Sequence, residues 1–336
     1  MEAHRPKVRG SGGIVRKDAG IKVRPKGPKP PKVLAAEERY YKFLKRYIES
    51  IRKEVFRKII PAYLKAQEEL AREEASKTEQ EDSQKARMGL DSADGTGRTP
   101  RPVTEGFLLT LDAQRREDTL WDFFSSNVDP TIWDSILKAT GKFSGTLIRK
   151  IIGNHFNLTD RVQLNNWKMI ARAGGIGDIR ESSPHLRVIS RTHIKRNVAL
   201  IKSIDKTLHG QLKDLIWKEF GKGTHVEKLS KLIGERFEVA ESRARLIAKD
   251  QTNKLFGQLQ QTRQEEVGVE EYIWRNSGDN RVRGKPGGLY PDSRYNHWER
   301  EGKRFSWKEP PPDGHPGEAV GCRCWAEPVI PEEEED

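Results

Sequence analysis

The chain has 336 residues, of which 34% are hydrophobic and 33% charged, and its mean hydropathy is -0.81. This length allows two domains, or one domain with long appendages, but the composition leaves only modest cores and much solvated surface. No apolar run is long enough to cross a bilayer, which excludes a membrane-spanning chain, and two cysteines one residue apart exclude a disulfide framework.

The residues behind Met1 contain no apolar segment of the kind found in secretion signals. The scarcity of cysteine also fits a reducing compartment. The sequence therefore predicts a soluble cytoplasmic protein.

Residues 1–33 hold most of the formal net charge of +12. They contain ten Lys or Arg and only two acidic residues, Glu2 and Asp18, which gives a net charge of +8. Their many prolines and glycines leave too little apolar surface to offset the entropy of ordering, which predicts a disordered basic arm. Clustered cations release condensed counterions when they meet phosphate, so the arm could contact DNA or an acidic protein surface; alternatively it is a solvated tail that aids solubility. The candidate DNA-contacting residues are Arg5, Lys7, Arg9, Arg16, Lys17, Lys22, Arg24, Lys26, Lys29 and Lys32.

Residues 34–76 have apolar side chains at helical spacing, from Tyr40 through Ile51 to Tyr63, which predicts an amphipathic helix. Pro61 should kink or divide that helix. Residues 77–106 lack both periodicity and apolar content and are interpreted as a linker.

Residues 107–267 are predicted to form a helical body. Apolar residues from Ile194 to Ile216 keep three- and four-residue spacing, and Gly221 then supplies a stop. A second helix is expected over residues 241–265.

The composition and the residue pattern change after Gly268. Tyr272-Ile273-Trp274 is a short strand-like run, residues 276–280 are a turn signal, and Gly, Pro, Arg and Trp are dense as far as Pro328. Residues 268–330 are therefore predicted to be a small loop-rich α+β module, and residues 331–336 an acidic tail. The predicted fold class is α+β, with a mainly helical body, this C-terminal module and the basic N-terminal arm.

Cys322-Arg323-Cys324 is the sharpest local motif. In an extended segment residues i and i+2 face the same side, so both thiolates could bind one cation, with His297 and His315 completing a tetrahedral zinc site. The alternative is two small buried side chains that flank a hydrogen-bonding arginine, because zinc ligands are usually separated by two to four residues. His315 could also be an ordinary loop histidine.

Two further features of this module remain open. Asp279, Arg281 and Arg283 could hold phosphate through a guanidinium fork, or form an ion pair that orders the turn. Four of the eight tryptophans fall between residues 274 and 325, where they could stack on bases or form the core of the module.

The order and spacing of residues 240–328 resemble those of the phage Mu protein F-like minor head proteins. In that family a helix leads into a strand that ends in Trp, followed by Asp and Arg, a His, a Gly with an aromatic, prolines, and a final Cys-Arg-Cys. Residues 197–237 resemble the family's preceding helices more loosely, and residues 1–106 are not covered. The matching residues here are Ile247-Ala248-Lys249, Trp274, Asp279, Arg281, His297, Gly302, Phe305, Pro316, Cys322-Arg323-Cys324 and Pro328.

One departure from the family pattern is visible. The segment 284–291 is longer than the usual link between Arg283 and His297, which affects the register of His297.

The resemblance implies a low-copy head-morphogenesis protein in the phage head interior or at the portal vertex, assembled in the host cytoplasm. Its implied partners are the portal protein, the major capsid or scaffold proteins and double-stranded DNA. It implies no catalytic residues. The alternative function is a zinc-dependent nuclease or a toxin-related transferase, but the paired Cys-x-x-Cys spacing of common nuclease sites is missing and no carboxylate with histidine marks a general base.

Overall fold

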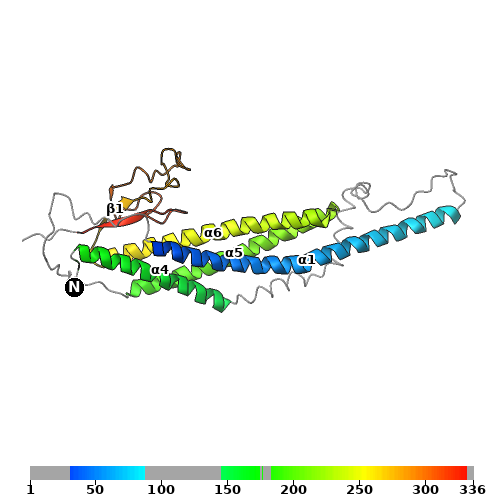
Figure 1. Cartoon of the computed structure of the whole chain (residues 1–336), viewed down its shortest axis with the longest axis horizontal. Coiled ribbons are helices and arrows are strands. Elements are labelled where there is room, and N and C mark those ends of the chain that lie inside the picture. The colour runs from blue at the N-terminus through cyan, green and yellow to red at the C-terminus, as the bar shows by residue number, and fades with distance from the viewer. Residues whose placement is uncertain (1–30, 88–144, 175, 177–182, 331–336) are drawn as a thin grey trace, which may run out of the picture. The chain divides into compact units, whose positions relative to one another are not determined.

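The computed structural model describes residues 31–87, 145–174, 176 and 183–330 (Figure 1). These contain α1 (Pro31–Arg87), α4 (Gly145–Ala173), α5 (Pro184–Gly221) and α6 (Val226–Glu265), followed by β1 (Glu271–Arg275), β2 (Arg304–Ser306) and β3 (Trp325–Val329). The predicted mainly helical α+β class is confirmed. Among the described helices, none combines the length and the apolar character that a bilayer crossing requires.

Three helix bounds differ from the sequence-based expectation, the first being that α1 begins at Pro31, within the residues 1–33 that were predicted to be a disordered arm. Helix α1 runs on through Pro61 and through residues 77–87, which were assigned to the linker. Those residues are rich in Lys, Glu, Gln, Ala and Arg, strong helix formers that sustain a helix without an apolar face for periodicity to reveal. Helix α6 begins at Val226 rather than at 241, because Leu229, Ile233 and Phe237 extend its buried stripe. The arm residues 1–30, residues 107–144 of the predicted body and the acidic tail lie outside the described residues.

The chain divides into two compact units, one with described residues 31–45, 145–202 and 243–330, the other with 46–87 and 203–242. In the second unit, Tyr63 of α1 lies at the turn between α5 and α6. Its hydroxyl donates to the carbonyl oxygen of Thr224 at 2.7 Å, and its ring meets Phe220 edge-on with centroids 5.5 Å apart. The Thr224 hydroxyl in turn donates to Glu219 at 2.8 Å, so this turn satisfies its polar groups internally.

In the first unit, apolar side chains from four helices form small separate clusters. Phe156 of α4 packs with Leu255 and Leu259 of α6. Trp167, also on α4, packs with Ile330, the residue that follows β3. The helices therefore bury their apolar stripes against one another, as their periodicity predicted.

A chain of buried hydrogen bonds links all four helices in this unit. The Tyr40 hydroxyl donates to Asn197 Oδ1 at 2.8 Å, and Asn197 Nδ2 reaches His193 Nδ1 at 3.3 Å. His193 Nε2 lies 3.2 Å from His155 Nδ1, and His155 Nε2 lies 2.9 Å from the Thr252 hydroxyl. That hydroxyl donates to a carbonyl of its own helix, so it accepts from His155. Each imidazole then uses one donor and one acceptor, which requires both to be neutral.

The electrostatics agree with neutral imidazoles. Burial lowers the pKa of His155 to about 3, and the neighbouring His193 adds to the shift. Burial also lowers the pKa of His193 to about 4, with a smaller contribution from Arg196. Both rings stay unprotonated well below neutral pH.

The three strands form an antiparallel sheet in the order β2-β1-β3. On the central strand β1, Tyr272 and Trp274 are fully buried, while Glu271, Ile273 and Arg275 are partly exposed, the alternation expected of a strand with one buried face. The sheet lies at the C-terminal end of α6 (Figure 1).

The histidine pair predicts a loss of stability in mild acid. Because the folded pKa values lie below about 6.5, the stabilisation is fully present above that pH and falls as the pH drops toward 4. Each histidine then contributes a loss on the order of 1 kcal/mol per pH unit. Urea unfolding at about pH 7 and about pH 5 measures it. His193→Gln should reduce the pH dependence of the unfolding free energy by about one proton. Replacing the exposed His185, as a control, should leave that pH dependence unchanged. If the wild type is equally stable at both pH values, the two histidines are not a neutral pair.

Candidate metal centre

The segment that carries the two cysteines lies directly on α6. A Cβ at Gly257 would stand 2.7 Å from the carbonyl oxygen of Pro316, and a Cβ at Gly317 would stand 2.9 Å from that of Asn253. Gly317 also has a φ of 95°, which residues with side chains rarely adopt. Glycine at 257 and 317 therefore allows the two backbones to touch.

Side chains of α6 hold this segment through its backbone. The Gln260 amide accepts from the Ala326 N–H at 3.2 Å and donates to the Ala326 carbonyl at 2.6 Å, and Gln264 also donates to that carbonyl at 3.2 Å. Asp250 Oδ1 accepts the N–H of Gly321 at 2.9 Å. Since Ala326 is fully buried, Gln260 supplies the hydrogen bonds that another strand would make at the open edge of β3.

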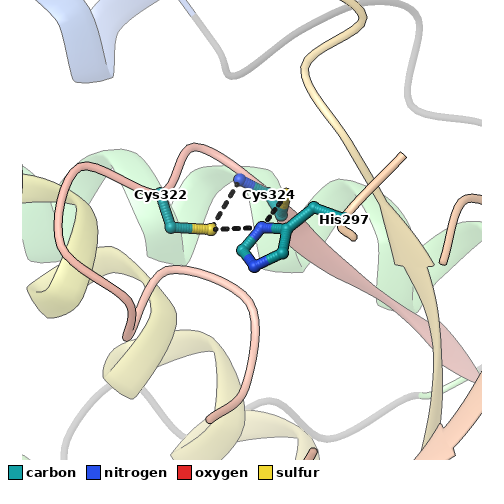
Figure 2. Close-up of side chains that lie close together, drawn as sticks. All are labelled: His297, Cys322 and Cys324. Carbon is teal, nitrogen blue, oxygen red and sulfur yellow. Dashed lines mark hydrogen bonds between the residues drawn. The ribbon is translucent and has the colours of Figure 1, made fainter. Parts of the chain in front are cut away.

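His297, Cys322 and Cys324 converge in this module (Figure 2). His297 Nδ1 lies 3.6 Å from Cys322 Sγ and 3.5 Å from Cys324 Sγ, and the three possible ligand atoms are all within 4.8 Å of one another. All three side chains are buried, and the cysteines share a core with Trp274 and Ala326. The edge of the Trp274 ring meets the imidazole with centroids 5.1 Å apart, which fixes its plane.

The other imidazole nitrogen is held by a carboxylate. His297 Nε2 donates to Asp313 Oδ2 at 2.7 Å, and Arg300 donates to Asp313 Oδ1 at 2.7 Å. Burial alone would raise the pKa of Asp313, but the hydrogen bonds from His297 and Arg300 outweigh it and hold that pKa below its usual range. With its proton on Nε2, the ring points the Nδ1 lone pair at the sulfurs.

The sulfur of Cys322 receives two backbone N–H groups, those of Gly317 and Cys324, both at 3.4 Å. A hydrogen bond from the Cys324 side chain lowers the pKa of the Cys322 thiol; burial opposes this, and His297 adds to it, so that the pKa lies well below the ordinary value. The environment therefore favours thiolate.

A hollow of about 20 Å³ adjoins the three side chains and is lined by Ser277, Arg281, Arg283 and Arg323 among others. The cluster thus opens onto a positively charged surface. Burial and then the charges of Arg323 and Arg281 lower the pKa of the nearby Lys249.

His315, the other histidine that the sequence suggested, is not brought into the cluster. Its Nδ1 lies 2.9 Å from the Tyr272 hydroxyl, and its ring packs on Trp307 with centroids 4.9 Å apart. Its backbone N–H donates to Glu318, which closes the turn at Gly314. His315 thus completes the aromatic core beneath the sheet.

The side chains of Asp279 and Arg283 contact different partners, and Arg283 Nη1 also lies 3.7 Å from Asp313 Oδ2. The Asp279 carboxylate pairs with Arg323 and accepts the backbone N–H of Arg281 at 2.9 Å. Arg283 donates to the carbonyl oxygen of Val320 at 2.9 Å. Of the ten candidate DNA-contacting residues, nine precede residue 31 and lie outside the described residues; Lys32 lies in α1, with its side chain not described.

Three functional residues were missed by the sequence reasoning. Asp313 lies in Pro312-Asp313-Gly314, which signals only a turn. Gln260 and Gln264 are polar residues on a helix, a pattern usually typical of a solvated face. The available signal was that Gln260, Gln264 and Gly257 share one side of α6 at three- and four-residue spacing.

The part of the chain that contains α6 and the cysteine cluster also matches a known protein family. Residues 210–327 match the family described as phage Mu protein F like protein. A Haemophilus influenzae protein described as uncharacterized is 34% identical over 140 residues, which cover 41% of this chain and 29% of that protein. The match thus spans less than a third of the relative. No solved structure matches the chain.

Replacing Gln260 tests the anchoring of β3. Gln260→Ala leaves the buried N–H of Ala326 without a partner and its carbonyl with the Gln264 amide alone, which is expected to cost about 2 kcal/mol of unfolding free energy. Gln261→Ala is the matched control, because Gln261 bonds only an exposed Glu265 and should change stability by less than about 0.5 kcal/mol. Urea unfolding compares them, and equal values for the two variants would argue against the anchor.

Proposed function

We propose that this chain is a minor head protein of a tailed bacteriophage, since residues 210–327 match the phage Mu protein F-like family. In this role it docks on the portal or inner shell and contacts packaged double-stranded DNA. The family match is the observation that carries the proposal, and at the level of the family it points to head morphogenesis. The matched residues contain all of α6, β1 and β2, the first three residues of β3, and the His297, Cys322 and Cys324 cluster.

Contact with DNA is assigned to residues 1–33. They concentrate a net charge of +8, and phosphate binding by clustered cations is strengthened by counterion release. The arm needs no fixed structure for this role, because phosphate contacts carry no sequence information.

Docking on the portal or shell is assigned to the loop before His297. Leu289 and Tyr290 are 58% and 55% exposed there, and Trp298 lies nearby in sequence with 37% of its surface exposed. Exposed apolar side chains of this size are the usual anchors of protein interfaces.

Neutralising part of the arm tests DNA contact. With Lys17, Lys22, Arg24, Lys26 and Lys29 changed to Gln, the slope of log affinity for duplex DNA against log salt should fall by about 4 if all five touch phosphate. The control removes the same charge from five exposed α1 residues and should keep the wild-type slope. An unchanged slope in the arm variant overturns this part of the proposal. The control residues are Arg39, Lys42, Lys53, Lys65 and Lys77.

Changing the exposed loop tests docking. The double variant Leu289→Ser, Tyr290→Ser should bind the portal protein of the same phage about 30-fold or more weakly than wild type, because truncated interface anchors cost about 2 kcal/mol or more. Met169→Ser with Val188→Ser, exposed residues on α4 and α5, is the control. Equal recovery of portal with both double variants refutes the loop as the docking surface.

A further inference from the structure

We infer that His297, Cys322 and Cys324 bind one zinc ion through Nδ1 and two thiolate sulfurs, that Asp313 positions the imidazole, and that solvent supplies the fourth ligand. This inference goes beyond the head-protein role and does not depend on it. His315 is not among the ligands.

The nitrogen-to-sulfur distances already match a tetrahedral zinc site. With zinc bonds of about 2.3 Å to sulfur and about 2.0–2.1 Å to nitrogen, a tetrahedral angle separates the two ligand atoms by about 3.6 Å. The observed separations of Nδ1 from the two sulfurs are 3.6 Å and 3.5 Å. An ion can therefore enter without displacing either cysteine from the imidazole.

One ion explains why both sulfurs approach the same ring nitrogen. With the Nε2 proton given to Asp313, Nδ1 has one lone pair and can accept the hydrogen of one thiol, yet both sulfurs approach it equally closely. One cation at the centre of the three atoms satisfies both sulfurs and the nitrogen together. Any proton still on a thiol leaves to solvent when the ion binds.

The surroundings supply what a metal-binding imidazole and thiolate need. Histidine ligands commonly donate their second ring nitrogen to a carboxylate, as His297 does to Asp313 at 2.7 Å, and Arg300 holds that carboxylate in turn. The two backbone N–H groups at 3.4 Å from Cys322 Sγ stabilise a thiolate in place.

The fourth position is assigned from the hollow beside the cluster. Its volume of about 20 Å³ has room for a group the size of water, and the cluster forms part of its lining. Two thiolates neutralise the charge of zinc, and Arg281 and Arg323 line the hollow, so the fourth position favours hydroxide or another small anion over a neutral ligand.

Metal analysis of the full-length protein, purified in reducing buffer without chelators, tests the site. We expect about one zinc per chain in the wild type and its loss in Cys322→Ser, Cys324→Ser and His297→Ala. His315→Ala is the matched control and should keep its zinc, although it loses a hydrogen bond to Tyr272. A folded, zinc-free wild type that takes up no added zinc overturns the inference, as does loss of zinc in His315→Ala with full retention in His297→Ala.

Because Cys322 and Cys324 are buried, their replacement can unfold the module, so a second test leaves them in place. Cobalt added to the metal-free wild type should give thiolate-to-cobalt charge-transfer absorption and the ligand-field bands of a tetrahedral ion. Asp313→Asn should keep these bands but weaken zinc affinity about 10- to 100-fold, because only the support of the imidazole is lost. Replacing the exposed Asp292 with Asn should leave the affinity unchanged.

The cobalt spectrum also separates the alternatives. Octahedral bands without thiolate charge transfer, or a Cys322–Cys324 disulfide in protein kept under reducing conditions, would contradict the site. An unchanged zinc affinity in Asp313→Asn would contradict the positioning role.

Discussion

The close approach of α6 to the segment 316–326 is the constraint on which the C-terminal module depends. Gly257 and Gly317 let two backbones touch where any side chain would separate them. Gln260 then binds both polar groups of Ala326, so the edge of β3 is fixed to the helix rather than to another strand. Because β3 begins directly after Cys324, this contact also sets where the two thiols lie. A sheet of three short strands has little stability of its own, and the helix supplies what it lacks.

Buried polar groups are satisfied in two different ways in the same unit. Between the helices, a single chain of hydrogen bonds runs from Tyr40 to Thr252 and requires His193 and His155 to be neutral. In the C-terminal module, a charged group satisfies its neighbours instead, because the Asp313 carboxylate accepts hydrogen bonds from both His297 and Arg300. Neutral chains suit a helix interface, since every member has one donor and one acceptor available. Charged clusters suit a loop-rich module, since one carboxylate can order several segments at once.

The proposed roles fall on different parts of the chain. The basic arm offers charge without requiring fixed geometry, whereas the family-matched residues 210–327 offer geometry, including the three converging side chains. A bound zinc would link the loop that carries His297 to the segment on α6 that carries the cysteines. Those two parts of the module otherwise meet through Asp313 and the aromatic core. The exposed Leu289 and Tyr290 belong to the same loop, so the proposed docking surface and the proposed metal ligand His297 lie close together in the sequence.

Local sequence patterns determined the helical class, the strand around Tyr272 and Trp274, and the shared face of Cys322 and Cys324. Each of these depends on which side chains of a single helix or strand face water. The spacing of neighbouring residues in the sequence is enough to set that. Tertiary structure alone decided that His297 rather than His315 meets the thiols and that Asp313 orients the His297 ring. It also decided that Gln260 makes the hydrogen bonds that a further strand would make at the edge of β3. The physical reason is that His297 and Cys322 lie 25 positions apart, and the path between them depends on contacts with distant residues, which local sequence patterns do not reveal.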